Sequence, residues 1–379
     1  MKSVVLVTPD DSGSLGSYEI LGAHVDICLA NEIEGAASQW FFFQVLDHRA
    51  GEPIHFSVLN EGRSLYPRGW INYRPVYSSD GHRWERVDAA SFTGKGTLEF
   101  VIQKPPTSFF VAWYEPYTLT RFLKWISRIR QKGGVNVDVS SNDFISLTMG
   151  RAVTGSIVII ARQHPGETMA SFFIEGLLNG LLEYYLSPSK ASLLELFEVK
   201  IYPLMNPAGV RRGRHRYSEG SVDFNRSWMN DNPPIELQQV KRELKEIRAL
   251  HCFFDIHGDE VTQTPPSHIE LESGGRLSKP ARVNRGALLD AIRERNADLE
   301  VVREPFFATR LRKFLSPGLY PAVRLSAGTT ATRFVTDMYA VPAFTYEISA
   351  HNTTGDACAT FGRSLATALA RYAERWSGA

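Results

Sequence analysis

Two apolar segments of the sequence end in side chains that could bind a metal ion. His164 and Glu167 follow the apolar run 156–161, and His257 follows the run 252–256. Two imidazoles and one carboxylate suit Zn²⁺, and a fourth position left to water would make such a site catalytic. Each signal also has a simpler interpretation. His164 and Glu167 could belong to a helix start, whose dipole favours a carboxylate, and His257 could be a buried histidine with an ordinary hydrogen bond.

Two further acidic residues could act with these side chains. Asp255 precedes His257 by two positions, so on a strand both point to the same side, and Asp255 could orient the imidazole. Glu347 ends the apolar run 342–346. On an edge strand it would face solvent, whereas burial would raise its pKa and suit it to proton transfer. A nearby metal would favour its charge instead, so the sequence leaves the net pKa shift open.

The elements that must position these residues form an α/β pattern between residue 115 and the C-terminal end. The expected strands are 144–149, 156–161, 199–205, 252–256 and 343–348, and the expected helices are 169–186, 235–250, 286–296 and 361–376. Near-continuous apolar strands indicate a mixed, largely parallel sheet with helices on both faces. Ligands of such sheets bind at the carboxyl ends of the strands. The Pro-, Gly- and Ser-rich stretch 261–285 predicts a long loop.

The first hundred residues have a different pattern. Short segments rich in aromatic and β-branched residues alternate with turn clusters, which indicates a small antiparallel β-sandwich. The expected strands here are 40–46, 55–59, 98–102 and 109–113. Apolar residues then recur at helical spacing from Leu119 to Ile129, and Gly133 and Gly134 end that helix. We therefore predict two domains, 1–114 and 115–379.

Composition excludes several classes of protein. The 379 residues are 43% hydrophobic and 22% charged with a net charge of +1, which is typical of a globular protein and predicts no nucleic-acid or membrane partner. The three cysteines are far apart, which argues against a disulfide framework. Neither a secretory signal nor a membrane-spanning run is recognisable, so we expect a cytoplasmic protein. The oligomeric state does not follow from the sequence.

Taken together, these segments resemble the zinc carboxypeptidase family, and in particular its cytosolic carboxypeptidase branch of bacterial type. The matching segments occur in the family's order and are Ala161–Ser171, Pro203–Val210, Gly213–Arg216, Val222–Trp228, Asp255–Gly258 and Phe344–Glu347. Their common order, more than any one segment, carries the resemblance. It covers residues 115–379, and the aromatic strands before it are similar to that branch's N-terminal β-sandwich.

The resemblance implies a role for each matching residue. His164, Glu167 and His257 hold one zinc ion per chain, and Glu347 activates the metal-bound water and passes its proton to the leaving amine. Arg216 stabilises the oxyanion, and Asn225 and Arg226 bind the terminal carboxylate of a peptide or protein substrate. These roles agree with the chemistry of the side chains. Zinc lowers the pKa of bound water to about 7, a guanidinium stabilises a developing oxyanion, and a planar Arg fork matches a carboxylate.

The chain departs from the family pattern at some positions. Ala208 stands where the family usually has Asp, so we expect altered support of the loop but surviving catalysis. Arg333 lies in the region of the family's side-chain pocket, and a cation there predicts a preference for C-terminal Glu or Asp. The family's substrate-binding tyrosine could be Tyr320 or Tyr339. Arg216 ends a basic run that could also be a solvated loop.

Other functions fit the sequence less well. A zinc amidohydrolase acting on small N-acyl amino acids would use the same metal chemistry, but the β-rich N-terminal domain and the pair Asn225–Arg226 favour a peptide C-terminus. A non-catalytic binding module would not need the full set of ligands together with Glu347. A zinc endopeptidase with His-Glu-x-x-His and a serine hydrolase with Gly-x-Ser-x-Gly are excluded, because neither motif occurs.

Overall fold

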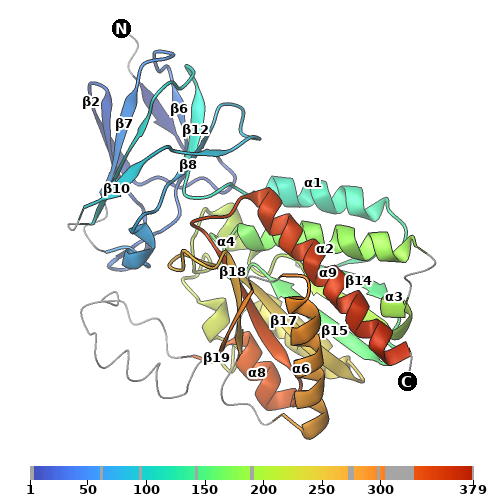
Figure 1. Cartoon of the computed structure of the whole chain (residues 1–379). Helices are drawn as coiled ribbons and strands as arrows, with labels where there is room; N and C mark the ends of the chain where they lie inside the picture. Colours follow the sequence, from blue (N-terminus) through green and yellow to red (C-terminus); the bar gives the residue numbers. More distant parts are fainter. Residues whose placement is uncertain are drawn as a thin grey trace.

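The computed structural model describes residues 4–59, 63–93, 96–140, 144–187, 192–271, 277–296, 299–303 and 328–377. Strands and one short 3-10 helix build the N-terminal part, and an eight-stranded sheet with helices on both faces builds the rest (Figure 1). The predicted fold class is therefore confirmed. The division between residues 114 and 115 stays a prediction.

Two five-stranded sheets form the N-terminal sandwich. One has the order β1 (Val5–Val7), β6 (Phe42–Leu46), β12 (Phe109–Ala112), β8 (Val76–Ser78) and β9 (Glu85–Arg86). The other has the order β10 (Ala90–Phe92), β11 (Thr97–Ile102), β7 (Ile54–Leu59), β3 (His24–Cys28) and β2 (Ser17–Leu21). All pairs are antiparallel except β3 with β7. Phe43 of one sheet meets Phe56 of the other at a ring distance of 5.9 Å, in the core between the sheets.

Two small elements lie outside these sheets. The strands β4 (Asn31–Ile33) and β5 (Ala36–Ala37) form a short hairpin, and the 3-10 helix η1 covers Pro67–Trp70. Both belong to the N-terminal sandwich. The strand β4 carries Glu32, η1 follows Tyr66, and these two residues contact a loop at residues 215–217, as described below.

The large sheet has the order β13 (Asn136–Val139), β14 (Ile145–Gly150), β16 (Phe197–Tyr202), β15 (Gly155–Ala161), β17 (Leu250–Asp259), β20 (Ala343–Ser349), β18 (Ser267–Leu271) and β19 (Glu300–Arg303). The four central strands β16, β15, β17 and β20 run parallel. Their carboxyl ends therefore lie side by side along one edge of the sheet. His257 and Glu347 stand near the ends of β17 and β20, and His164 follows the end of β15.

Helices cover both faces of this sheet. One face packs against α1 (Leu119–Arg130), α2 (Met169–Tyr185), α6 (Lys279–Arg293) and α9 (Gly355–Ser377), and the other against α5 (Ile235–Glu246) and α8 (Ala331–Tyr339). Shorter helices are α3 (Ser192–Leu196), α4 (Pro207–Arg211) and η3 (Phe224–Arg226). Along β15, Ile157 and Ile159 join the first core and Val158 and Ile160 the second. This alternation explains why the strand is apolar throughout.

Three expectations from the sequence are wrong. The stretch 261–285 is not one long loop, because it contains β18 and the first turns of α6, which begins after the cap residue Ser278. Helix α8 was not expected. The interpretation of Glu347 as a solvent-facing residue on an edge strand also fails, because β20 lies inside the sheet between β17 and β18.

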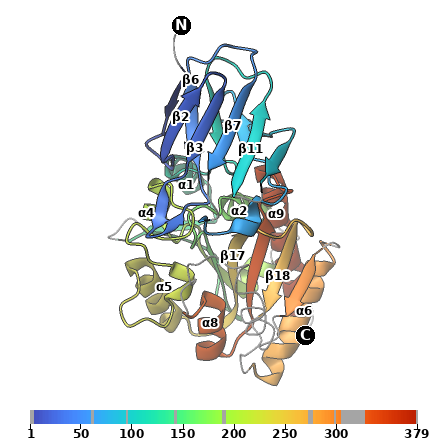
Figure 2. The ribbon, with the colours of Figure 1, turned by 90° about the vertical axis from the view of Figure 1, so that its left-hand side faces the viewer.

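The sandwich contacts the carboxyl-end side of the sheet, with α2 and α4 directly beneath it (Figure 2). The guanidinium of Arg86 donates to the carbonyls of Ala350 and Thr353, which follow β20. The carboxylate of Asp11 accepts from the first backbone N–H groups of α1, at Leu119 and Thr120. None of the helices in the described ranges combines the length and the apolar character needed to cross a membrane.

The partly buried His251 of β17 gives a prediction about acid stability. Burial lowers the pKa of His251 to about 4, below the ordinary value near 6.5. Between these values the unfolded chain binds a proton that the folded chain does not, so stability falls as the pH drops from 6.5 to 4. We expect the wild type to lose up to about 3 kcal/mol of unfolding free energy over this range that His251→Gln does not lose. Urea unfolding at pH 7, 6, 5 and 4 measures this difference, and equal losses in both proteins would rule it out.

Candidate metal centre and active site

The loop between β15 and α2 has a fixed conformation that presents His164 and Glu167. Arg162 begins it with a positive φ of 62° and is buried, and its guanidinium donates to the carbonyl of Pro165 and to the hydroxyl of Ser171, both at 2.7 Å. The N–H of Gly166 donates to the carbonyl of His215 at 2.7 Å, and a Cβ at Gly166 would overlap the His215 side chain. The glycine therefore allows the two loops to approach closely.

The three predicted ligands converge on one point. His164 Nδ1 lies 2.5 Å from Glu167 Oε1, and His257 Nδ1 lies 2.8 Å from Glu167 Oε2. One donor atom from each residue falls within 4.8 Å of the others, and all three side chains are buried. The N–H of Gly258 also donates to Glu167 Oε2 at 3.0 Å, which fixes the carboxylate.

The far nitrogens of the two histidines face carboxylates. His164 Nε2 lies 3.3 Å from Asp223 Oδ1, and His257 Nε2 lies 2.9 Å from Asp255 Oδ2. A proton on each Nε2 would be held by its carboxylate, which leaves the Nδ1 lone pairs directed into the cluster as metal ligands. Asp255 thus takes the orienting position that its spacing from His257 suggests.

The charges in the cluster shift the pKa values strongly. Burial opposes ionisation of Glu167, but the charges of His164 and His257 outweigh it and hold the pKa of Glu167 well below its usual range. Burial disfavours the charged form of His257, yet Asp255 and Glu167 raise its pKa well above 6.5. With no cation present, a proton on His257 offsets part of the carboxylate charge. A divalent cation would take over this compensation.

Glu347 lies beside the cluster on the neighbouring strand. Its Cα pairs with that of His257 between β20 and β17. The side chain is deeply placed but keeps part of its surface open to solvent. Burial raises the pKa of Glu347 well above its usual range, and the opposing charge of His257 only partly offsets this. A carboxylate that takes up a proton readily beside an open space suits a general base.

Arg216 belongs to the same buried network and not to a solvated loop. Its Nε donates to Asp223 Oδ2 at 2.8 Å, and its Nη1 donates to the hydroxyl of Tyr66. Nη2 lies 2.8 Å from Asp223 Oδ2 but has no hydrogen bond of good geometry within the described residues. The guanidinium is thus held at two points and has N–H groups left for another acceptor.

Asn225 and Arg226 follow on η3. Asn225 is buried, its Nδ2 lies 3.1 Å from His257 Nε2, and its Oδ1 accepts from the N–H of Ala331 at 2.9 Å. Arg226 is partly buried and donates to the carbonyl of Asn225 at 2.7 Å. The segment therefore ties the metal cluster to the start of α8.

The residues expected to govern specificity are less closely connected to the cluster. Arg333 lies on α8 and forms an ion pair with Asp337 one turn later, at 2.5 Å, and its side chain is 36% exposed. Tyr339 ends the same helix and is half-buried beside Phe334. Tyr320 lies outside the described residues. No described contact joins Arg333 or Tyr339 to the three ligands.

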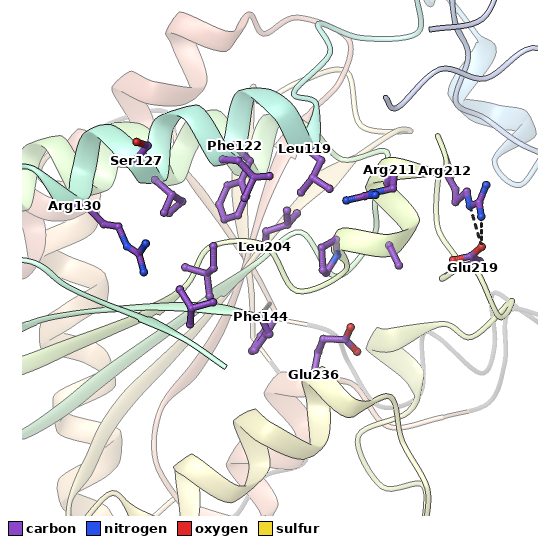
Figure 3. Close-up of a pocket in the computed structure, with 16 residues that line it drawn as sticks. Leu119, Phe122, Ser127, Arg130, Phe144, Leu204, Arg211, Arg212, Glu219 and Glu236 are labelled. Carbon is purple, nitrogen blue, oxygen red and sulfur yellow. Dashed lines mark hydrogen bonds and ion pairs between the residues drawn. The ribbon is translucent and has the colours of Figure 1, made fainter. Parts of the chain in front are cut away.

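Ala208 lies on the opposite side of its loop from the cluster. It belongs to α4, whose cap residue Asn206 accepts from the N–H of Gly209 at 3.0 Å. Ala208 also lines a groove of about 750 Å³ between α1, α4 and the start of α5, shown in Figure 3. The residues that line this groove include none of the three ligands, so it is separate from the metal centre.

Sequence reasoning missed several partners of the site. Asp223 stands in the matching segment Val222–Trp228 and could have been singled out by its position two residues before Asn225. Gln163, whose Nε2 donates to Asp255 Oδ2 at 2.7 Å, also lies in a matching segment. Tyr66 gave no signal, because nothing local links it to a loop 150 residues later.

Family models match nearly all of the N-terminal part of the chain and the first half of the part that follows. The cytosolic carboxypeptidase N-terminal domain matches residues 7–114, and the zinc carboxypeptidase model matches residues 137–254. The chain belongs to the zinc carboxypeptidase family. An uncharacterized protein of Zymomonas mobilis is 30% identical over 262 residues, which are 66% of this chain and 66% of that protein. Cytosolic carboxypeptidase 1 of Gallus gallus is 26% identical over 65% of this chain, but the match spans only 25% of that longer protein.

Solved structures with the same fold support this assignment. A metallo-carboxypeptidase from Pseudomonas aeruginosa, solved in complex with (2-guanidinoethylmercapto)succinic acid, is 25% identical with a TM-score of 0.81, over 97% of this chain and 98% of that one. A metallo-carboxypeptidase from Burkholderia cenocepacia has a TM-score of 0.83 over 99% of this chain and all of that one. Its identity of 22% shows the shared fold alone.

The three candidate ligands of this chain fit the zinc ion that the family uses. Two imidazole Nδ1 atoms and a carboxylate are ligands that zinc prefers, and three protein ligands leave a position for water or substrate. The orienting carboxylates Asp223 and Asp255 complete the arrangement. Asp255 Oδ1 has no hydrogen-bond partner in the described part of the chain, so this buried group depends on the charge of its histidine.

Asp255 provides a test of this arrangement. We expect Asp255→Asn to weaken zinc binding about 10- to 100-fold, because an amide holds the imidazole with less charge and a weaker hydrogen bond. Competition with a chromogenic zinc chelator measures the affinity, and Asp231→Asn on an exposed loop is the matched control. An unchanged affinity in Asp255→Asn would show that the His257–Asp255 contact does not support the ligand.

Proposed function

We propose that this protein is a cytoplasmic zinc-dependent metallo-carboxypeptidase that hydrolyses C-terminal residues from peptides or proteins. The observation that carries the proposal is the convergence of His164, Glu167 and His257 on one point, with Glu347 on the adjoining strand. A structural zinc site would have four protein ligands and no general base beside it. The names of the cytosolic carboxypeptidase relatives support the proposed location.

Each residue of the site has a chemical task in this proposal. Zinc, when bound, supplies a Lewis acid that makes water acidic enough to attack near neutral pH. Glu347 takes the proton of the attacking water and later delivers it to the leaving amine, a task suited to a carboxylate whose pKa is raised by burial. Arg216 supplies a guanidinium to the carbonyl oxygen, where negative charge develops.

The proposed substrate is a chain end because of the cations near the cluster. Arg226 offers a planar fork that matches a carboxylate through two hydrogen bonds, and Asn225 adds an amide next to it. These two residues lie on η3, which Asn225 joins to the start of α8 by accepting from the N–H of Ala331. A terminal carboxylate bound there would place the last peptide bond towards the metal cluster. An endopeptidase would have no use for such a group.

Replacement of the proposed base tests the mechanism. We expect Glu347→Gln to keep about one zinc per chain and to lose about 10²- to 10⁴-fold in kcat, because an amide cannot accept the proton. The measurements are zinc content and single-residue release from peptides ending in Glu, Asp, Leu, Phe and Lys, with the exposed Glu246→Gln as control. Retained turnover in Glu347→Gln would contradict the role of Glu347. Hydrolysis of N-acyl amino acids without any peptide trimming would favour a small-molecule amidohydrolase.

We also propose a preference for acidic C-terminal residues, with Arg333 as the cation that selects them. Arg333 is on α8, whose first N–H group binds Asn225, so the helix is joined to the proposed carboxylate site. Its ion pair with Asp337 must open or reorient for a substrate side chain to bind. Since the pair is partly exposed, this competition costs little.

Two variants test this preference in opposite directions. We expect Arg333→Ala to lower the ratio of kcat/KM for peptides ending in Glu to that for peptides ending in Leu. Asp337→Asn, which frees Arg333 from its ion pair, is expected to raise the same ratio. Steady-state rates on the two peptides give the answer. If neither variant moves the ratio, Arg333 does not select the side chain.

A further inference from the structure

A buried carboxylate of the N-terminal sandwich reaches into the loop that carries Arg216. Glu32 of β4 is 2% exposed. Its Oε1 accepts from the backbone N–H groups of Arg216 at 2.5 Å and Tyr217 at 2.6 Å, and its Oε2 accepts from the N–H of His215 at 3.0 Å. One carboxylate thus binds three consecutive amides. Such charge-assisted bonds are stronger than those between neutral groups, and they offset the cost of burying the charge.

A second residue of the sandwich holds the other end of the same side chain. The hydroxyl of Tyr66 accepts from Arg216 Nη1, and its ring meets that of His215 edge to face at 5.5 Å. Burial keeps the pKa of Tyr66 well above 10, so the hydroxyl stays neutral at physiological pH. Arg216 is therefore fixed at its backbone by Glu32 and at its guanidinium by Tyr66.

The residues just before His215 also contact the sandwich. Arg214 Nη1 donates to the carbonyl of Glu32 at 2.5 Å, and the N–H of Ser12 donates to the carbonyl of Arg211 at 3.1 Å. Residues 212–223 contain no strand or α-helix of their own. Their conformation therefore depends on contacts with other parts of the protein, and the sandwich supplies several of these.

We propose that Glu32 and Tyr66 are positioning residues for Arg216, so that the N-terminal sandwich completes the catalytic centre instead of merely covering it. This inference rests on the role proposed above for Arg216. Glu32 sets the direction in which the side chain leaves the backbone, and Tyr66 orients the guanidinium so that Nη2 faces the reacting carbonyl. A misplacement of about 1 Å in such a group costs about 10²-fold in rate.

The first experiment compares two conservative variants with matched controls. Tyr66→Phe keeps the ring and removes only the hydroxyl, and Glu32→Gln keeps the shape but turns an amide towards backbone donors. We expect each to lower kcat about tenfold or more while KM changes less than about twofold and zinc content stays the same. Tyr18→Phe and Glu34→Gln, at exposed positions of the same sandwich, should match the wild type. Unchanged kcat in Tyr66→Phe and Glu32→Gln would overturn the proposal.

A second experiment separates positioning from general stability. If Tyr66 acts through Arg216, Tyr66→Phe should lower kcat in the wild-type background and have no further effect in the Arg216→Ala background. An equal loss in both backgrounds would show that Tyr66 acts by another route, and would overturn its assignment. Zinc content and melting temperature of the four proteins show that the comparison is between folded enzymes.

A third measurement does not depend on activity. Amide hydrogen exchange of the peptide that contains residues 215–217 should be slow in the wild type and at least about tenfold faster in Glu32→Gln. An unchanged exchange rate in Glu32→Gln would show that Glu32 does not fix this loop. A wild type that trims no peptide would contradict the proposed function and the catalytic part of this inference, whereas the exchange result would still decide whether Glu32 fixes the loop.

Discussion

Compensation of buried charge is the constraint on which the rest of this structure depends. Glu167, Asp223, Asp255 and Glu347 lie in a region where solvent has little access, and unpaired charges in such surroundings are costly. Asp223 is matched by Arg216 and His164, and Asp255 by His257 and Gln163. The remaining negative charge of Glu167 is what a divalent cation can neutralise. Zinc binding at this point must therefore release protons, which makes the affinity depend on pH.

The scaffold meets this constraint by bringing strand ends together. The parallel strands β15, β17 and β20 deliver their polar residues to one edge, and backbone pairing fixes His257 next to Glu347. The interior of the sheet is apolar on both faces, so the charged groups are confined to the edge. The N-terminal sandwich lies against that edge and contributes Glu32 and Tyr66 to the arrangement. Strands thus hold His257 and Glu347 in place, and loops between elements carry His164, Glu167 and Arg216.

Much of this could be predicted from the sequence, because the physics involved is local. Apolar runs identified the central strands, and the polar residues after them identified the ligands and Glu347. Strand order is not local, so the placement of β20 inside the sheet could not be derived, and the edge-strand interpretation of Glu347 stayed open. The strand β18 was hidden in a stretch whose Pro, Gly and Ser residues indicate a loop. Helix α8 has an apolar face, but it covers only nine residues and follows several threonines.

Contacts between the two parts of the chain could not be predicted from the sequence either, because they are also non-local. Glu32 and Arg216 are 184 positions apart, and neither residue stands in a pattern that suggests the other. A lone glutamate on a short strand is ordinarily a surface residue. Only the folded chain shows that its carboxylate is buried against three amides. The candidate site residues that the sequence revealed stand in recognisable motifs. The residues that it did not reveal, such as Glu32 and Tyr66, contact those motifs from distant parts of the chain.

The order of the elements along the chain has a consequence for protein synthesis. The sandwich emerges first and brings Glu32 and Tyr66 with it, and Arg216 follows later. Glu347 comes on β20, after every metal ligand, and α9 must then pack on α2 to cover the sheet. Because domains fold as units and β20 lies inside the large sheet, that sheet cannot be completed until β20 has left the ribosome. In the mechanism proposed above, the partly made chain therefore lacks hydrolytic activity, since both the finished sheet and Glu347 are still missing.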